Sequence, residues 1–223
     1  MPQSPPDTAT SAISADEALQ RLVDGNRRFC RGEPRFPTTQ KDILVHLAEG
    51  QRPFATILGC SDSRVPPELI FDAGLGALFV VRVAGNVLSP EVSGSMQYAG
   101  VHLHTQLFVV LGHEGCGAVQ AALDMMLHGV RQRSRIETLI DDIVPGLHEV
   151  DLQAPPAVQL ARAVDANVRW SMRQILATPE VQARLPEGRM KLVGGIYDIA
   201  SGAVRFLPGD GVESHAGGRN AQR

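Results

Sequence analysis

The sequence predicts an α/β fold in which a mainly parallel central β-sheet is flanked by helices and preceded by an N-terminal helical arm. Two observations lead to this prediction. Short apolar segments alternate with amphipathic helical patterns along most of the chain, as in strand–helix–strand units. The apolar segments are nearly continuous in Val, Ile, Leu and Phe, as expected of strands that are buried on both faces of a parallel sheet.

The N-terminal part of the chain reads as a tail followed by two helices. Residues 1–13 lack a basic start and an apolar run, so we expect a disordered tail and not a secretory signal. A helix is predicted after Ser14, because Glu17 three residues later completes a capping box. A second helical pattern, "KDILVHLAEG", ends at Gly50. We interpret residues 14–49 as a helical arm that packs on the sheet or on a partner subunit.

The remaining chain, residues 50–208, is expected to form the α/β domain. Helical patterns lie between and after the predicted strands, and a long helix is expected at 157–177. The last two apolar segments, "MKLVGGIYDI" and "AVRFL", are expected to form a hairpin across "ASG". Residues 209–223 are Gly-rich and polar and are predicted to be a second disordered tail. The strands that precede the long helix are predicted at 54–60, 77–83 and 106–113.

Composition excludes several classes of partner. Lys and Arg number 21 against 24 Asp and Glu, for a formal charge of −3, which argues against a nucleic-acid or anionic-membrane partner. No segment approaches the roughly 20 apolar residues of a membrane-spanning helix. The three cysteines, Cys30, Cys60 and Cys116, are an odd number without framework spacing. We therefore expect a reducing, cytoplasmic location, with thiols free for metal binding or catalysis.

Reactive side chains follow the first and third predicted strands. In "CSDSR", Cys60, Asp62 and Arg64 lie two residues apart, and "GHEGCG" contains His113 and Cys116. Ligands of open α/β sheets bind at the carboxyl ends of the strands. If the two strands are neighbours, two thiols, an imidazole and a carboxylate converge there. That set is a plausible tetrahedral shell for zinc, which favours sulfur and nitrogen ligands over the oxygen ligands of magnesium or calcium.

Two other interpretations of these segments remain open from the residues alone. "GHEGCG" follows a strand and opens a helix, as a phosphate-binding turn of a dinucleotide site does. Its spacing is G-x-x-G-x-G and not G-x-G-x-x-G, and no acidic residue ends a second strand about 20 residues later. A cysteine at a strand end can also be a small buried apolar residue with no chemical role.

The motifs together resemble the β-class carbonic anhydrases. "CSDSR" with a later "GHxxCG" resembles the family pattern, and "ALQRLVDGNRRF", "FVVRVAGN" and "GGIYDIASGAV" are similar to other family segments, so the resemblance covers most of residues 16–208. It implies a lyase, a carbonate dehydratase in which a zinc-bound hydroxide reversibly hydrates CO2 to bicarbonate and a proton. It also implies one Zn²⁺ per subunit and a homodimer or a dimer of dimers (a tetramer), in which the N-terminal helices embrace the partner subunit.

The resemblance also assigns roles around the metal. It implies that Cys60, His113 and Cys116 are the permanent zinc ligands. Asp62 corresponds to a carboxylate that either pairs with Arg64 and leaves the fourth zinc position open, or binds zinc in a closed form. A bidentate pair with Arg64 would hold this carboxylate beside the reacting water.

For the substrate, the resemblance implies four further positions. Gln51 corresponds to a glutamine that donates a hydrogen bond to substrate oxygen, and Gly117 would offer its backbone N–H. Phe79 and Tyr98 correspond to residues that line the CO2 pocket, partly across the dimer interface. Ile57 stands where some members carry a tryptophan that binds regulatory bicarbonate. We therefore expect no such inhibitory site, and an open zinc site at moderately alkaline pH.

Two alternative functions are retained. A hydrolase of carbonyl sulfide or carbon disulfide could use the same zinc scaffold with a different pocket. A non-catalytic zinc-binding protein could also carry the ligands, but it would have no need for the Asp62–Arg64 pair or for Gln51.

Overall fold

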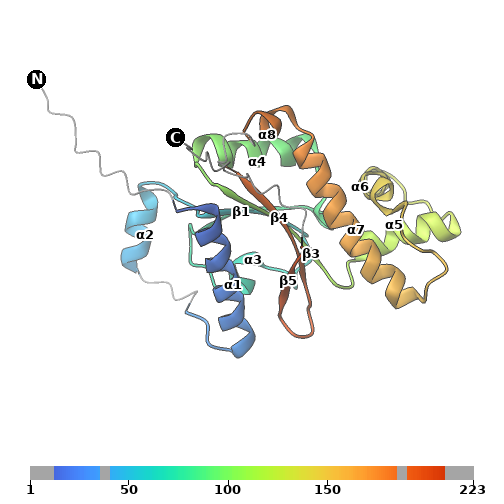
Figure 1. Ribbon diagram of the computed structural model, residues 1–223, viewed down its shortest axis with the longest axis horizontal. Helices are drawn as coiled ribbons and strands as arrows, with labels where there is room; N and C mark the ends of the chain where they lie inside the picture. The colour runs from blue at the N-terminus through green and yellow to red at the C-terminus, as the bar shows by residue number, and fades with distance from the viewer. Residues whose placement is uncertain (1–12, 36–40, 185–189, 209–223) are drawn as a thin grey trace, which may run out of the picture.

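A five-stranded sheet forms the centre of the computed structural model, which describes residues 13–35, 41–184 and 190–208 (Figure 1). The strand order is β2-β1-β3-β4-β5; the first four strands are parallel, and β5 pairs antiparallel with β4. The prediction of a mainly parallel α/β sheet that ends in a hairpin is thereby confirmed. The strands are β1 (Ala55–Gly59), β2 (Leu78–Arg82), β3 (Leu107–His113), β4 (Lys191–Tyr197) and β5 (Val204–Phe206).

Helices connect and cover these strands. The long helix and the two N-terminal helices appear within two residues of their expected positions, whereas the short α3 and α8 were not predicted. Neither is long enough to show a helical period. Of the predicted tails, residues 1–12 and 209–223 lie outside the described residues. The helices are α1 (Ala15–Arg31), α2 (Lys41–Ala48), α3 (Pro67–Ile70), α4 (Pro90–His102), α5 (Gly117–His128), α6 (Arg135–Ile143), α7 (Pro156–Leu176) and α8 (Pro179–Arg184), with 3₁₀ turns η1 (Ala84–Asn86) and η2 (Val144–Leu147).

The sheet is buried on both faces, and successive residues of each strand enter different apolar layers. On β1, Ile57 packs into the layer under α1 and α3, whereas Leu58 packs into the layer under α5, α6 and α7. On β3, Val109 packs into the layer with Ile57 and Val110 into the layer with Leu58. Figure 1 shows α1 and α3 on one side of the sheet and α7 on the other. This double burial explains why the strands are apolar without alternation.

Helix α1 packs on the sheet of its own chain. The hydroxyl of Ser14 accepts a hydrogen bond from the Glu17 amide at 3.1 Å, so this half of the predicted capping box forms, whereas the Glu17 carboxylate accepts a hydrogen bond from Arg21. Gly25 brings the helix close to α3, because a Cβ atom there would lie within 1.8 Å of the Phe71 carbonyl oxygen. The buried Asn26 amide donates to the carbonyl of Gly202 at 2.8 Å. The expected contact of this helix with a partner subunit stays a prediction.

The topology determines where a ligand can bind. Strands β1 and β3 are neighbours, in a register that pairs Gly59 with Leu111, so their carboxyl ends meet. Strand β1 lies between β2 and β3, so the strand that follows it in the sequence is on one side and the next strand is on the other. The direction in which strands are added to the sheet therefore changes at β1. Such a switch point is where open α/β sheets bind their ligands. Within the described residues, no helix combines the length and apolar character that crossing a membrane requires.

Candidate metal centre

The carboxyl ends of β1 and β3 bring two cysteines and a histidine together. Cys60 directly follows β1, His113 is the last residue of β3, and Cys116 is the N-cap of α5. Their ligand atoms lie within 4.8 Å of one another, and the two sulfur atoms are 4.0 Å apart. All three side chains are buried. In the part of the chain that the structure describes, no other cluster of three or more His, Cys, Asp or Glu side chains could hold a metal ion.

The histidine is oriented as a metal ligand. Nδ1 of His113 lies 3.0 Å from the backbone carbonyl oxygen of Glu114, so the ring proton is held at Nδ1 and Nε2 is left with its lone pair. Nε2 is buried and has no hydrogen-bond partner among the described residues. A buried polar atom without a partner requires an explanation. A zinc ion bound by Nε2 and the two sulfur atoms would supply it, so the residues fit this metal.

The two thiols share their protons unequally when no metal is bound. The hydrogen bond between them lowers the pKa of Cys60 despite its burial, and backbone N–H groups of Gly85 and Asp62, each 3.4 Å from its sulfur atom, add to this effect. The same contact and burial raise the pKa of Cys116. Burial disfavours protonation of His113, but the neighbouring Cys60 sulfur atom outweighs it and raises the pKa of His113. Metal binding would displace the protons that Cys116 and His113 hold, because these residues bind a metal as thiolate and neutral imidazole.

Beside these ligands, a carboxylate is held by an arginine. Nε and Nη2 of Arg64 donate to the two carboxylate oxygens of Asp62 at 2.9 and 2.7 Å, and the Arg64 amide donates to Oδ1 at 3.0 Å. This pairing is the main reason why the pKa of Asp62 lies well below its usual value. Oδ2 of Asp62 lies 3.9 Å from Nε2 of His113, adjacent to the ligand atoms. The carboxylate thus lies next to the cluster while Arg64 holds it.

The residues that hold this turn were not predicted from the sequence. The guanidinium group of Arg82 donates to the carbonyl oxygens of Cys60 at 3.0 Å and Asp62 at 2.6 Å. It fixes the backbone that carries the first ligand and the carboxylate. The available signal was a charged residue in the last position of a buried strand, inside "FVVRVAGN". The amide of Gly85, which donates to the Cys60 sulfur atom, comes from the same segment.

Of the residues predicted to bind substrate, one lies beside the ligands. Gly117, the first residue of α5, directly follows Cys116, and its position in the first helical turn leaves its N–H without a partner in the helix. Gln51 is exposed in the loop before β1, in a surface hollow shared with Leu75 and Gly76. The structure therefore does not bring Gln51 into the cluster of ligands.

The two predicted pocket aromatics lie together at the sheet edge. Phe79 pairs in register with Thr56, four positions before Cys60, which is about 13 Å along the strand. The ring of Tyr98 on α4 lies 6.2 Å from that of Phe79, and this residue is 47% exposed. Within one chain, neither ring is placed against the cysteines.

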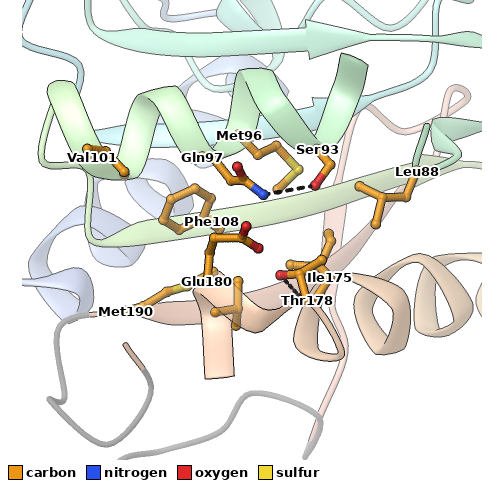
Figure 2. Close-up of a pocket in the computed structure, with 12 residues that line it drawn as sticks. Leu88, Ser93, Met96, Gln97, Val101, Phe108, Ile175, Thr178, Glu180 and Met190 are labelled. Atoms are coloured by element: carbon orange, nitrogen blue, oxygen red, sulfur yellow. Dashed lines mark hydrogen bonds between the residues drawn. The ribbon is translucent and has the colours of Figure 1, made fainter. Parts of the chain in front are cut away.

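A separate, small apolar pocket of about 40 Å³ lies between α4 and the end of α7 (Figure 2). Met96 and Phe108 are among its lining residues, and Ser93 accepts a hydrogen bond from Gln97 at its edge. None of the predicted site residues lines it. The pocket is therefore distinct from the metal centre.

An open α/β sheet with a Cys2His cluster and a paired carboxylate at its switch point defines a class: a metal-dependent enzyme that acts on a small substrate. Comparison with known proteins narrows this class. The sequence model of the family described as "Carbonic anhydrase" matches residues 55–204. Carbonic anhydrase 2 of Mycobacterium tuberculosis is 38% identical over 201 residues, covering 86% of this chain and 91% of the relative. The carbonic anhydrase of Mycolicibacterium smegmatis is 36% identical over 189 residues, covering 85% and 91%.

Solved structures agree with this relationship. The β-carbonic anhydrase of Coccomyxa, in complex with acetazolamide, superposes with a TM-score of 0.67 at 26% identity and covers 85% of this chain and 86% of that one. A β-carbonic anhydrase of Aspergillus fumigatus gives a TM-score of 0.68 at 26% identity, covering 86% and 90%. The chain belongs to the carbonic anhydrase family, in its β class.

Proposed function

We propose that this chain catalyses the reversible hydration of CO2 to bicarbonate and a proton, with one Zn²⁺ per subunit held by Cys60, His113 and Cys116. The observation that carries the proposal is the juxtaposition of this buried ligand set with the Asp62–Arg64 pair. A zinc ion in such a shell supplies a Lewis acid that activates water near neutral pH. A structural zinc site would have no use for a carboxylate that is held beside its ligands.

Asp62 and Arg64 have complementary roles in this proposal. Because its pKa lies well below the usual value, Asp62 is ionised throughout the neutral range and can only accept hydrogen bonds. Asp62 accepts a hydrogen bond from the reacting water. This hydrogen bond directs a lone pair of the water oxygen toward the carbon atom of CO2. Arg64 keeps the carboxylate in that position and prevents it from turning to the metal position, which it occupies in the closed form. The exposed N–H of Gly117 donates to an oxygen atom of the substrate.

The rest of the substrate pocket is proposed to come from a second copy of the chain. Gln51, Phe79 and Tyr98 do not reach the cysteines of their own chain. Among the described residues, β2 pairs only with β1, so the backbone N–H and C=O groups of its other edge are unpaired there, and its residues Val80 and Val81 are half-buried. An apolar strand edge of this kind favours pairing with another chain. A homodimer across this edge, alone or as a dimer of dimers, would bring the aromatics of one subunit toward the other.

The free cysteines support a proposed cytoplasmic location. Cys30, Cys60 and Cys116 are all unpaired in the structure. The centre requires two of them as thiols, which a reducing compartment preserves.

Stopped-flow CO2 hydration tests the function. The zinc-loaded protein should turn over CO2 between pH about 6.5 and 9, with a rate that rises toward alkaline pH, because two anionic thiolates make the zinc less acidifying. Cys116→Ser should abolish turnover together with zinc binding, whereas Asp62→Asn should reduce turnover and leave zinc content unchanged. No turnover by zinc-loaded protein at any pH would reject the proposal in favour of a hydrolase of sulfur analogues or a non-catalytic zinc protein.

A further inference from the structure

The turn η1 lies between the metal centre and helix α7. Gly85 adopts φ 71° and Asn86 adopts φ 45°, so both residues are in the left-handed region. A Cβ atom at Gly85 would lie 2.7 Å from Cδ1 of Ile143 and 3.1 Å from Cβ of Ala118. Glycine is therefore required at this position for conformation and for space. Such a turn persists only where its surroundings hold it.

Two polar side chains of α7 bind this turn. Nδ2 of Asn167 donates to the Gly85 carbonyl oxygen at 2.8 Å, and the hydroxyl of Ser171 donates to the Asn86 carbonyl oxygen at 2.9 Å. Both side chains are fully buried and lie four residues apart, on a face of α7 that is otherwise mainly apolar. Burying polar groups is unfavourable unless they are hydrogen-bonded. The two carbonyl groups explain the buried Nδ2 of Asn167 and the buried hydroxyl of Ser171, whereas Oδ1 of Asn167 has no hydrogen-bond partner among the described residues.

The same turn donates a hydrogen bond to a metal ligand. The Gly85 N–H points to the Cys60 sulfur atom at 3.4 Å. The Gly85 N–H and carbonyl group belong to adjacent peptide planes that meet at its Cα atom. Holding the carbonyl group therefore restricts φ and ψ of this glycine and, with them, the direction of the N–H. A hydrogen bond to a thiolate lowers the electron density that sulfur can give to a metal. The contacts on α7 and the donor strength of Cys60 are therefore linked through one residue.

We propose that Asn167, supported by Ser171, is a positioning residue for the metal centre: it holds the Gly85 carbonyl group so that the Gly85 N–H donates to the Cys60 sulfur atom. This inference rests on the proposed zinc ligation by Cys60. It assigns to α7 a part in setting the electronic character of the metal, although no side chain of α7 is a ligand. Partners of this kind typically change metal affinity or activity by about 10–100-fold when they are removed.

Cobalt(II) substitution tests the inference without any measurement of turnover. Asn167→Leu keeps the volume of the side chain and removes its N–H group, and Ser171→Ala removes only a hydroxyl group. Ile175→Ala, a buried truncation two turns further along α7, is the matched control for a loss of packing. The readouts are the thiolate-to-cobalt charge-transfer band and the rate of cobalt release to a chelator.

Loss of the N–H···S bond raises the energy of the sulfur lone pair. The energy of the charge transfer from sulfur to the metal therefore falls. We expect the charge-transfer band of Asn167→Leu to shift to longer wavelength, with a rate of metal release that differs by at least about tenfold from that of the unaltered protein. Ser171→Ala should shift the band in the same direction by less, and the Ile175→Ala spectrum should match that of the unaltered protein.

An Asn167→Leu band at the parent wavelength, or an equal shift in Ile175→Ala, would overturn the inference. If Asn167→Leu does not fold, Ser171→Ala decides: a shift supports the inference and an unshifted band overturns it. If the unaltered protein shows no thiolate-to-cobalt band, Cys60 is not a ligand and the inference is rejected as well. A protein with the band and the variant shifts but without CO2 hydration would refute the proposed function and leave this inference standing.

Discussion

Replacing Gly85 by alanine should destabilise the protein far more than the same change at Gly32. The two glycines have nearly the same backbone conformation, with φ values of 71° and 69°. The surroundings differ, because a Cβ atom at Gly32 would meet no atom within 4 Å, whereas at Gly85 it would meet Ile143 and Ala118. The pair of variants thus separates backbone strain from crowding.

The magnitudes follow from these geometries. A non-glycine residue in the left-handed region costs roughly 1–2 kcal/mol, of which the smaller entropy of the unfolded chain offsets about 0.4–1 kcal/mol. Gly32→Ala should therefore cost about 1 kcal/mol. Gly85→Ala adds overpacking of about 1–3 kcal/mol against Ile143 and Ala118. Its free energy of unfolding should fall by about 2–4 kcal/mol.

Urea unfolding followed by circular dichroism measures both costs. All samples need the same protein concentration and the same metal content, because association and ligands that bind the folded state change the apparent stability. Gly129, with φ 65° and open space around it, supplies a second control in the same class as Gly32. Equal losses for Gly85→Ala and Gly32→Ala, within about 0.5 kcal/mol, would refute the reasoning; Ile143 would then move aside without cost.

Three further predictions concern the centre itself. Arg64→Gln should lower the rate of CO2 hydration by about 10–100-fold with zinc content unchanged, because Asp62 loses the group that orients it; loss of zinc in this variant would contradict that role. Chelation of zinc should abolish CO2 hydration and lower the melting temperature, and added Zn²⁺ but not Mg²⁺ should restore both, since sulfur and nitrogen ligands disfavour magnesium; recovery with Mg²⁺ would count against the ligand set. Pairing with Arg64 lowers the pKa of Asp62 in the folded protein, so its stabilising contribution is complete above the unfolded value of about 3.9 and is lost as the pH falls through the lower folded value. The difference in unfolding free energy between Asp62→Asn and the parent should therefore be constant from pH about 5 to 8 and shrink below about 4, and a change between 5 and 8 would show that another group titrates with it.

The fold and the ligand cluster were predictable because local patterns determine them. Continuous apolar segments indicated strands buried on both faces, and the residues directly after two such strands carried the chemistry. Convergence of Cys60 with His113 required only that β1 and β3 be neighbours, which the structure bears out. The capping hydrogen bond at Ser14 was equally local.

The residues that hold the centre could not be predicted in this way. Arg82 acts through carbonyl groups about 20 positions earlier, and Asn167 and Ser171 act on a turn 82 and 85 positions away. Such contacts depend on the packing of α7 against η1, which no local pattern encodes. A polar pair four residues apart on the buried face of α7 was a visible signal, but its target became clear only in the folded chain.

The orientation of His113 has a consequence for how this centre varies among mutants. Many metal-binding histidines rely on a carboxylate side chain to fix the ring proton. Here the acceptor is the carbonyl oxygen of Glu114, the next residue, whose amide in turn donates to the Tyr197 carbonyl oxygen at 2.9 Å. The tautomer of His113 is thus determined by a backbone acceptor, which a side-chain substitution does not remove. Alanine substitution of Glu114 keeps this carbonyl oxygen, so an alanine scan would not detect its contribution. Replacement of the amide bond by an ester would change the acceptor and reveal it.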